Sequence, residues 1–288
     1  MAINEDRLFT IVLLVVMLTF IGFHKAQAAE PWEAGMKIGA YSNVYHSVDD
    51  EDGDWYVSPL LAYSNATKPK KGLAWTIQGV LDGYVYRDEH DLNSVALTLT
   101  PGLWYAPDRS TQMRVQPFAQ IKAVNDSDQS ASAYGGSVSL DHQWSKTFGS
   151  GVYLRYLDSH AREHVYSAEE SALGASLDLN LTSKWYGSCW YEYAHGSNYQ
   201  SMTVAVPAAN AWGWNLGYAG IYPFREYNSQ TVTILLTGKQ DTQSLGLRSG
   251  YAWTPRILTE LAYVHRKADS DWGDVSSDEV SCGVYLRF

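Results

Sequence analysis

The sequence predicts an all-β fold, a transmembrane antiparallel up-and-down β-barrel of about fourteen strands, within a range of twelve to sixteen. Three observations predict it. The chain repeats segments in which apolar and polar residues alternate, its composition is rich in aromatic residues, and its connections alternate between long acidic and short basic ones. The last segment is typical: Val280, Val284 and Leu286 fall on one face, with Tyr285 and Arg287 on the other.

Alternating segments run through the whole chain. They lie at 33–45, 55–65, 73–86, 94–105, 114–122, 137–144, 152–156, 173–181, 185–195, 212–222, 231–239, 244–253, 258–266 and 279–288. A tilted strand of about ten residues crosses a bilayer, which is close to the length of most of these segments. The 21 Tyr and 11 Trp residues favour strands and membrane interfaces.

The connections form two groups. The long ones, at 46–54, 87–93, 125–132, 158–170, 196–211 and 267–278, carry most of the acidic residues outside the segments. The short ones, at 66–72, 106–112, 145–148, 182–184 and 254–256, carry Lys and Arg. Because hairpin ends alternate along an up-and-down sheet, this sorting predicts an acidic end and a basic end of one barrel.

The N-terminus carries an apolar run from Leu8 to Phe23, followed by Ala26-Gln27-Ala28. This pattern predicts a secretory signal peptide over residues 1–28 and a barrel over residues 29–288. An uncleaved anchor helix is the alternative, although the run is short for a membrane span.

Charge and composition exclude several function classes. The formal net charge is −10, and the only basic cluster lies at 68–71, so we expect no nucleic-acid partner. Two cysteines do not make a metal site, and no motif indicates a cofactor. A soluble β-sandwich would have to bury many unpaired charges on the polar faces of its strands, which disfavours it.

A chain that ends on Phe288, with no polar tail after it, resembles the closing strand of bacterial outer-membrane β-barrel proteins of the monomeric porin-like class. The resemblance covers the whole chain after the signal peptide and does not single out one family. It implies a place in the outer membrane with both termini periplasmic. It also implies three partners: outer-membrane lipid, lipopolysaccharide, and the barrel-assembly machinery, which reads the terminal Phe288.

The polar faces of the strands predict the lining of a lumen. The predicted pore-lining residues are Lys37, Asp82, Tyr84, Arg114, Lys122, Asp141, Arg155, Asp178, Glu192, Arg248, Glu260 and Arg287. Such a lining favours passive passage of small hydrophilic solutes or saccharides. Because acids and bases nearly match, we expect no strong ion selectivity.

A lipid hydrolase is the alternative function. His195 and Ser197 share a face of one strand, as a base and its nucleophile can, and Asn210 follows at a distance suited to orient the His. The pattern His195-Gly196-Ser197-Asn198 resembles the active-site strand of outer-membrane phospholipase A and of lipid A deacylases. Tyr199 departs from the small residue usual there, and we favour passage over catalysis.

A structural or adhesive barrel is the second alternative. Acidic residues in the first long connection would bind divalent cations and bridge to lipopolysaccharide. The metal candidates are weak, because the spacing of a complete calcium loop is missing. They are Asp49, Asp50, Asp52 and Asp54.

Overall fold

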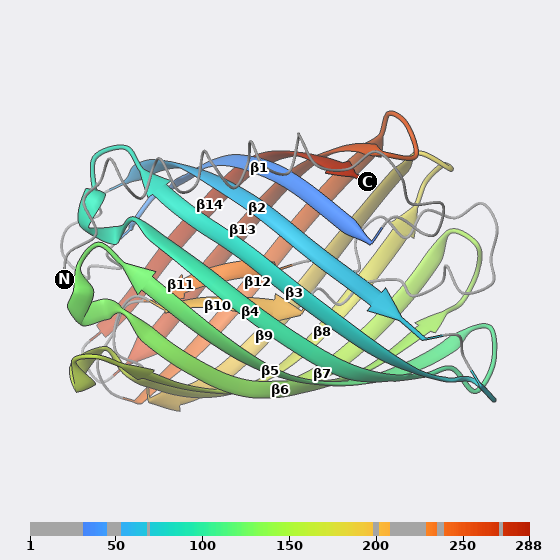
Figure 1. The fold of residues 1–288 in the computed structure, drawn as a ribbon, viewed down its shortest axis with the longest axis horizontal. Coiled ribbons are helices and arrows are strands. Elements are labelled where there is room, and N and C mark those ends of the chain that lie inside the picture. The colour runs from blue at the N-terminus through green and yellow to red at the C-terminus, as the bar shows by residue number, and fades with distance from the viewer. Residues whose placement is uncertain are drawn as a thin grey trace.

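The structure, a computed structural model of the full chain, describes residues 31–44, 53–67, 70–197, 202–207, 229–234, 239–270 and 273–288. In the described part, twelve antiparallel strands close into a barrel in the order β1-β14-β13-β12-β9-β8-β7-β6-β5-β4-β3-β2 (Figure 1). The predicted fold class is confirmed, with the strand number at the lower end of the predicted range.

The wall strands are ten to fifteen residues long. They are β1 Trp32–Tyr41, β2 Asp54–Ala66, β3 Leu73–Tyr86, β4 Ser94–Tyr105, β5 Thr111–Val124, β6 Ala131–Gln143, β7 Phe148–Ala161, β8 Ala168–Asn180, β9 Trp185–Ser197, β12 Lys239–Ala252, β13 Ile257–Ser270 and β14 Gly273–Arg287. Closure pairs β1 with β14, so every wall strand has two neighbours and no edge stays open.

The two ends of the barrel differ. At one end, here called the loop end, three connections contain the short 3₁₀ helices η1 His90–Leu92, η2 Ser127–Gln129 and η3 His164–Tyr166. β13 and β14 remain paired up to Ser270 and Gly273 at this end, so the prediction of 267–278 as a long connection is wrong. At the other, the turn end, hairpins are tight and the last residue, Phe288, exchanges backbone hydrogen bonds with Trp32. The loop end lies on the left of Figure 1 and the turn end on the right, near the C-terminus.

Local chemistry shapes the turns. In the β4–β5 turn, the Asp108 carboxylate accepts hydrogen bonds from the backbone amides of Ser110 and Thr111, both at 2.7 Å. These donors favour the charged carboxylate and lower the pKa of Asp108 below its usual value. In the β2–β3 turn, Lys71 and Gly72 both have positive φ, the conformation that glycine adopts without strain.

One predicted wall strand is not in the wall. Residues 231–234 belong to β11 Ser229–Ile234, which pairs with β10 Met202–Pro207 in a separate two-stranded sheet. The prediction of 231–239 as a wall strand is therefore wrong, as is that of 196–211 as a plain loop. β9 instead pairs directly with β12, Ser197 opposite Lys239. Alternation shows that a strand has two faces but does not specify its partner. The predicted strand 212–222 lies outside the described residues.

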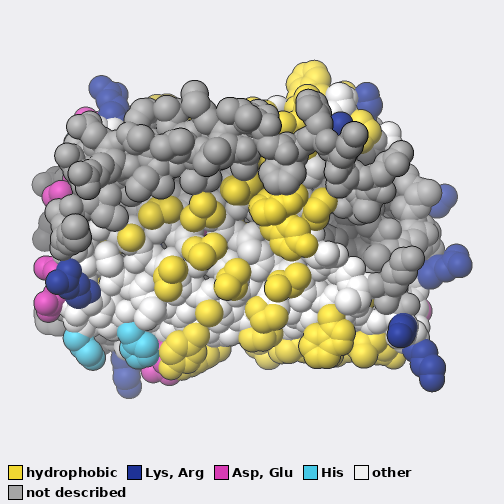
Figure 2. Space-filling view, viewed as in Figure 1, with side chains coloured by type: hydrophobic (Ala, Val, Ile, Leu, Met, Phe, Trp, Pro, Cys, Tyr) yellow, Lys and Arg dark blue, Asp and Glu magenta, His cyan; other side chains and the backbone are white. Residues whose placement is uncertain are grey.

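The barrel is apolar outside and polar inside. On β7 the outer Val152 and Leu154 are 50% and 59% exposed, whereas Tyr153 and Arg155, which alternate with them, are buried. Hydrophobic side chains form a band around the middle, with charged side chains toward both ends (Figure 2). Such a surface suits lipid rather than water. Among the described residues, no helix is long and apolar enough to cross a membrane.

Candidate functional site: the polar interior

The interior is the candidate site, because the barrel buries its charges there. Of the twelve predicted pore-lining residues, all are buried except Lys37 and Arg287, which are half-buried. The strand pattern therefore brought them onto the inner face as expected. Whether they line a path for a solute stays a prediction.

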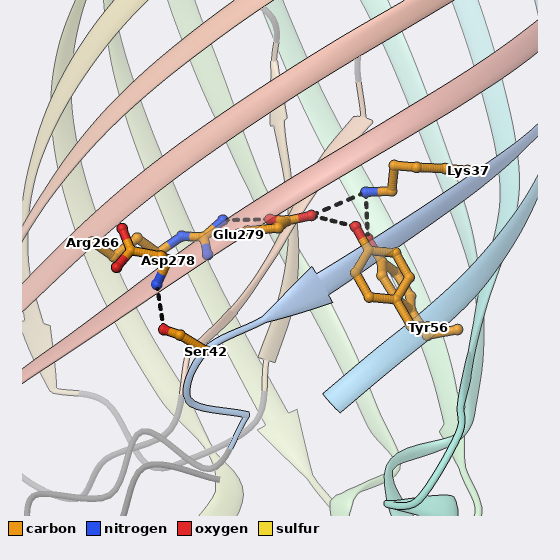
Figure 3. Close-up of polar contacts among 7 residues, drawn as sticks. Lys37, Ser42, Tyr56, Arg266, Asp278 and Glu279 are labelled. Atoms are coloured by element: carbon orange, nitrogen blue, oxygen red, sulfur yellow. Dashed lines mark hydrogen bonds and ion pairs between the residues drawn. The ribbon is translucent and has the colours of Figure 1, made fainter. Parts of the chain in front are cut away.

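A cluster near the loop end is centred on Glu279 of β14 (Figure 3). Its carboxylate accepts hydrogen bonds from the Tyr56 hydroxyl at 2.5 Å and from the Lys37 ammonium at 3.3 Å. Arg266 of β13 donates to the second oxygen at 3.1 Å. The Lys37 ammonium also lies over the Tyr84 ring, 5.3 Å from its centroid. Two cations and a hydroxyl thus compensate one buried carboxylate.

A second cluster surrounds Arg155 of β7. Its guanidinium forms ion pairs with Glu170 of β8 and, at 2.9 Å, with Glu192 of β9. The Tyr153 hydroxyl donates to the other oxygen of Glu192 at 2.7 Å. The three strands are neighbours, so the pairs tie adjacent strands together across the inner face.

A third group lies toward the turn end. Arg248 of β12 forms an ion pair with Glu260 of β13 at 3.6 Å and donates to the Ser188 hydroxyl at 3.2 Å. The Tyr186 hydroxyl donates to Glu260 at 2.8 Å. Asp178 of β8 differs from these residues, because both of its buried carboxylate oxygens lack a hydrogen-bond partner among the described residues.

Several interior residues were missed by the sequence prediction. Glu279, Arg266 and Glu170 hold two of the clusters, yet none was named as pore-lining. The alternation of side chains between the two faces of a strand was the available signal. Glu279 shares a face with Arg287, and Arg266 shares one with Glu260. Glu170 was assigned to a loop, because the alternation of β8 was recognised only from residue 173 onward.

The candidates for the alternative functions lie elsewhere. His195 and Ser197 are on the outer face of β9, and no hydrogen bond joins their side chains. The partner of His195 is Asp241 of β12, with His195 Nδ1 2.7 Å from the carboxylate. Asn210 lies outside the described residues, so its predicted role is not placed.

Of the four metal candidates, only Asp54 is described. Its carboxylate accepts hydrogen bonds from the backbone amides of Trp55, Asp88 and Glu89 at 2.6, 3.1 and 2.9 Å. Asp54 thus caps the connection between β3 and β4. Within the described ranges no cluster of His, Cys, Asp or Glu side chains suits a metal ion.

No protein-family model and no curated protein sequence matches the chain. Solved structures do. An outer membrane channel from Pseudomonas putida F1 is 10% identical, with a TM-score of 0.58, over 93% of this chain and 98% of that chain. The NanC porin is 11% identical (TM-score 0.47, 88% and 100% covered), and the KdgM porin 10% identical (TM-score 0.43, 89% and 99% covered).

The chain has the fold of an outer-membrane channel barrel. At this sequence identity the likeness establishes the fold alone, and it confirms the predicted class. In this barrel the interior holds several ion pairs, and the oxygens of Asp178 have no hydrogen-bond partner among the described residues.

Proposed function

We propose that this outer-membrane barrel is a channel for the passive passage of small hydrophilic solutes, saccharides among them. The observation that carries the proposal is the polar interior. Arg155 Nε and Nη1, Arg248 Nη1 and both oxygens of Asp178 are buried without a hydrogen-bond partner among the described residues. A dry interior would make each such atom costly, by roughly 1–3 kcal/mol. Water molecules held between these side chains would satisfy such atoms, which favours a wet interior.

The wall supports the same proposal. Barrels of eight strands are filled by their own side chains, whereas those of sixteen or more enclose open channels. Twelve strands lie between these limits. Pairs such as Arg155–Glu192 hold inner side chains against the wall.

The placement of the chain follows from this proposal. Residues 1–28 act as the signal peptide. The first and last residues of the barrel wall both face the periplasm, because Trp32 and Phe288 meet at the turn end. Phe288 is then displayed to the assembly machinery at the end from which the barrel is inserted. The acidic loop end faces outward.

The test is conductance. The purified, folded protein added to planar bilayers should produce discrete current steps. Folding is checked first, by the shift in gel mobility that a β-barrel shows on heating. Silent bilayers from protein that passes this check would refute the proposal.

A further inference from the structure

The outer face carries a side-chain arrangement that recurs at three places near the loop end. In each, one Asp carboxylate holds a Tyr hydroxyl and a His ring. We name these the rim clusters: Tyr134, Asp158 and His160; Tyr193, His195 and Asp241; Tyr263, His265 and Asp278.

The geometry is closely similar in two of the clusters. Asp241 Oδ1 lies 2.7 Å from the Tyr193 hydroxyl and 2.7 Å from His195 Nδ1. Asp278 Oδ1 lies 2.6 Å from the hydroxyl of Tyr263, with His265 Nδ1 at 2.9 Å. In both, Tyr and His are two residues apart on one strand and the Asp comes from the next strand.

The third cluster uses the same groups in another order. The Tyr134 hydroxyl donates to Asp158 Oδ2 at 2.6 Å, and His160 Nε2 lies 3.3 Å from Oδ1. The Tyr134 and His160 rings are in contact, with centroids 5.9 Å apart. This cluster joins β6 to β7, so the three occupy different strand pairs around the barrel.

The rim clusters lie where the apolar band ends. His195 and His160 side chains are each 61% exposed. Figure 2 shows His side chains at the loop end, next to both hydrophobic and charged side chains. A membrane protein meets lipid headgroups at this level, and Tyr is enriched there.

A basic residue lies next to each rim cluster, on the side of the loop end. Arg162 follows His160 by two residues, and Lys267 follows His265 by two. Lys239 stands opposite Ser197, which follows His195 by two. Lys267 also forms an exposed ion pair with Asp274 at 2.7 Å. The order from the band outward is therefore Tyr, His and a cation.

The hydrogen bonds determine what each His presents. A carboxylate only accepts, so the ring nitrogen of His195 and of His265 that faces Asp carries a proton. The second nitrogen of each ring, Nε2, is then left for an outside partner. His160 uses Nε2 toward its Asp and has Nδ1 left. The carboxylate thus fixes the direction of the ring, as second-layer carboxylates do for ligand-binding His residues.

We propose that the rim clusters bind the phosphorylated headgroups of lipids in the outer leaflet. In its protonated form each His ring donates from its outward nitrogen to the phosphate. The neighbouring Arg162, Lys239 or Lys267 contacts the same phosphate, and the Tyr ring lies beside the first sugar or glycerol. Asp158, Asp241 and Asp278 are engaged by Tyr and His, so their charge is partly compensated where the phosphate approaches. The inference rests on the proposed orientation, with the loop end outward, and does not depend on channel activity.

The recurrence also bears on His195. If His195 and Asp241 were two parts of a catalytic triad, the same pair would have no reason to recur at His265 and Asp278. Residue 267, which matches Ser197 in position, is Lys. A shared role in lipid binding accounts for all three.

The test is a triple variant, His160→Asn, His195→Asn and His265→Asn, of the full-length protein. An Asn amide replaces the Nδ1–H donor of His195 and His265 and removes their outward nitrogen. The matched control is His142→Asn at the turn end. The His142 ring lies against the Trp144 ring, with the centroids 4.4 Å apart, and hydrogen-bonds to the Thr111 hydroxyl. Binding is measured by native mass spectrometry, with lipopolysaccharide or phosphatidylcholine added to the folded protein.

The wild type and His142→Asn should retain lipopolysaccharide in preference to phosphatidylcholine. The triple variant should bind it about fivefold more weakly for each site, since a cationic contact near a membrane contributes about 1 kcal/mol. Should the triple variant misfold, Arg162→Gln with Lys239→Gln and Lys267→Gln provides the same measurement. Binding equal to wild type in both variants would overturn the proposal. A second result would also overturn the proposal: chelation of divalent cations abolishes lipopolysaccharide binding, while the His variants bind as the wild type does. The carboxylates would then act through a metal ion.

Discussion

Arg155→Met should destabilise the barrel strongly. The Arg155 side chain is 2% exposed and lies between Glu170 and Glu192, so its removal leaves two buried carboxylates with no cation beside them. Removing one partner of a buried ion pair costs about 3–5 kcal/mol. The Tyr153 hydroxyl, which donates to Glu192, compensates only part of this charge. We therefore expect a loss of about 3 kcal/mol or more.

The assay is reversible urea unfolding in lipid vesicles, followed by Trp fluorescence. Two further variants distinguish a loss of stability caused by uncompensated buried charge from one caused by lost packing. Arg155→Met combined with Glu170→Gln and Glu192→Gln should regain most of the stability, because no charge is left uncompensated. Lys267→Met, which breaks an exposed pair with Asp274, should cost under about 1 kcal/mol. A loss for Arg155→Met no larger than for Lys267→Met would refute the reasoning.

Three further predictions concern the inner and outer faces. Gly174→Ala should lower the free energy of unfolding in urea by about 1–3 kcal/mol, since a Cβ there meets the Tyr153 ring. Gly79→Ala should leave it unchanged, because a Cβ at that position makes only ordinary contacts. Asp178→Asn should lower the preference for cations over anions, measured as the reversal potential in a salt gradient, because it removes an inner carboxylate whose oxygens have no hydrogen-bond partner among the described residues; an unchanged potential would contradict this. Ser197→Ala should leave any esterase activity in mixed micelles unchanged, and a complete loss would restore the hydrolase interpretation.

Some features of the barrel were predictable because they are local. The side chains of a strand alternate between faces whatever the strand pairs with, so parity placed Asp82, Arg155 and Glu260 on the buried face. The same parity put His195 and Ser197 outside. The acidic and basic connections could likewise be assigned to opposite ends, because hairpins reverse direction at every turn.

Other features depend on which strands meet, and no local pattern contains that. β9 pairs with β12 because their backbones hydrogen-bond in register, although 41 residues separate Ser197 from Lys239. The prediction of 231–239 as a wall strand failed at this point. The partners of each charge follow from the same registers. Glu170 therefore reaches Arg155, while Asp178, eight residues later on the same strand, has no hydrogen-bond partner among the described residues.

The sequence by itself therefore determined which side chains face inward, which face outward and which connections share an end, since each follows from the two-residue period of a strand. Only the tertiary structure decided the closure of β1 on β14, the ion pairs of the interior and the three rim clusters. Each of these joins neighbouring strands, and contacts between strands depend on backbone pairing that the alternation of apolar and polar residues leaves open.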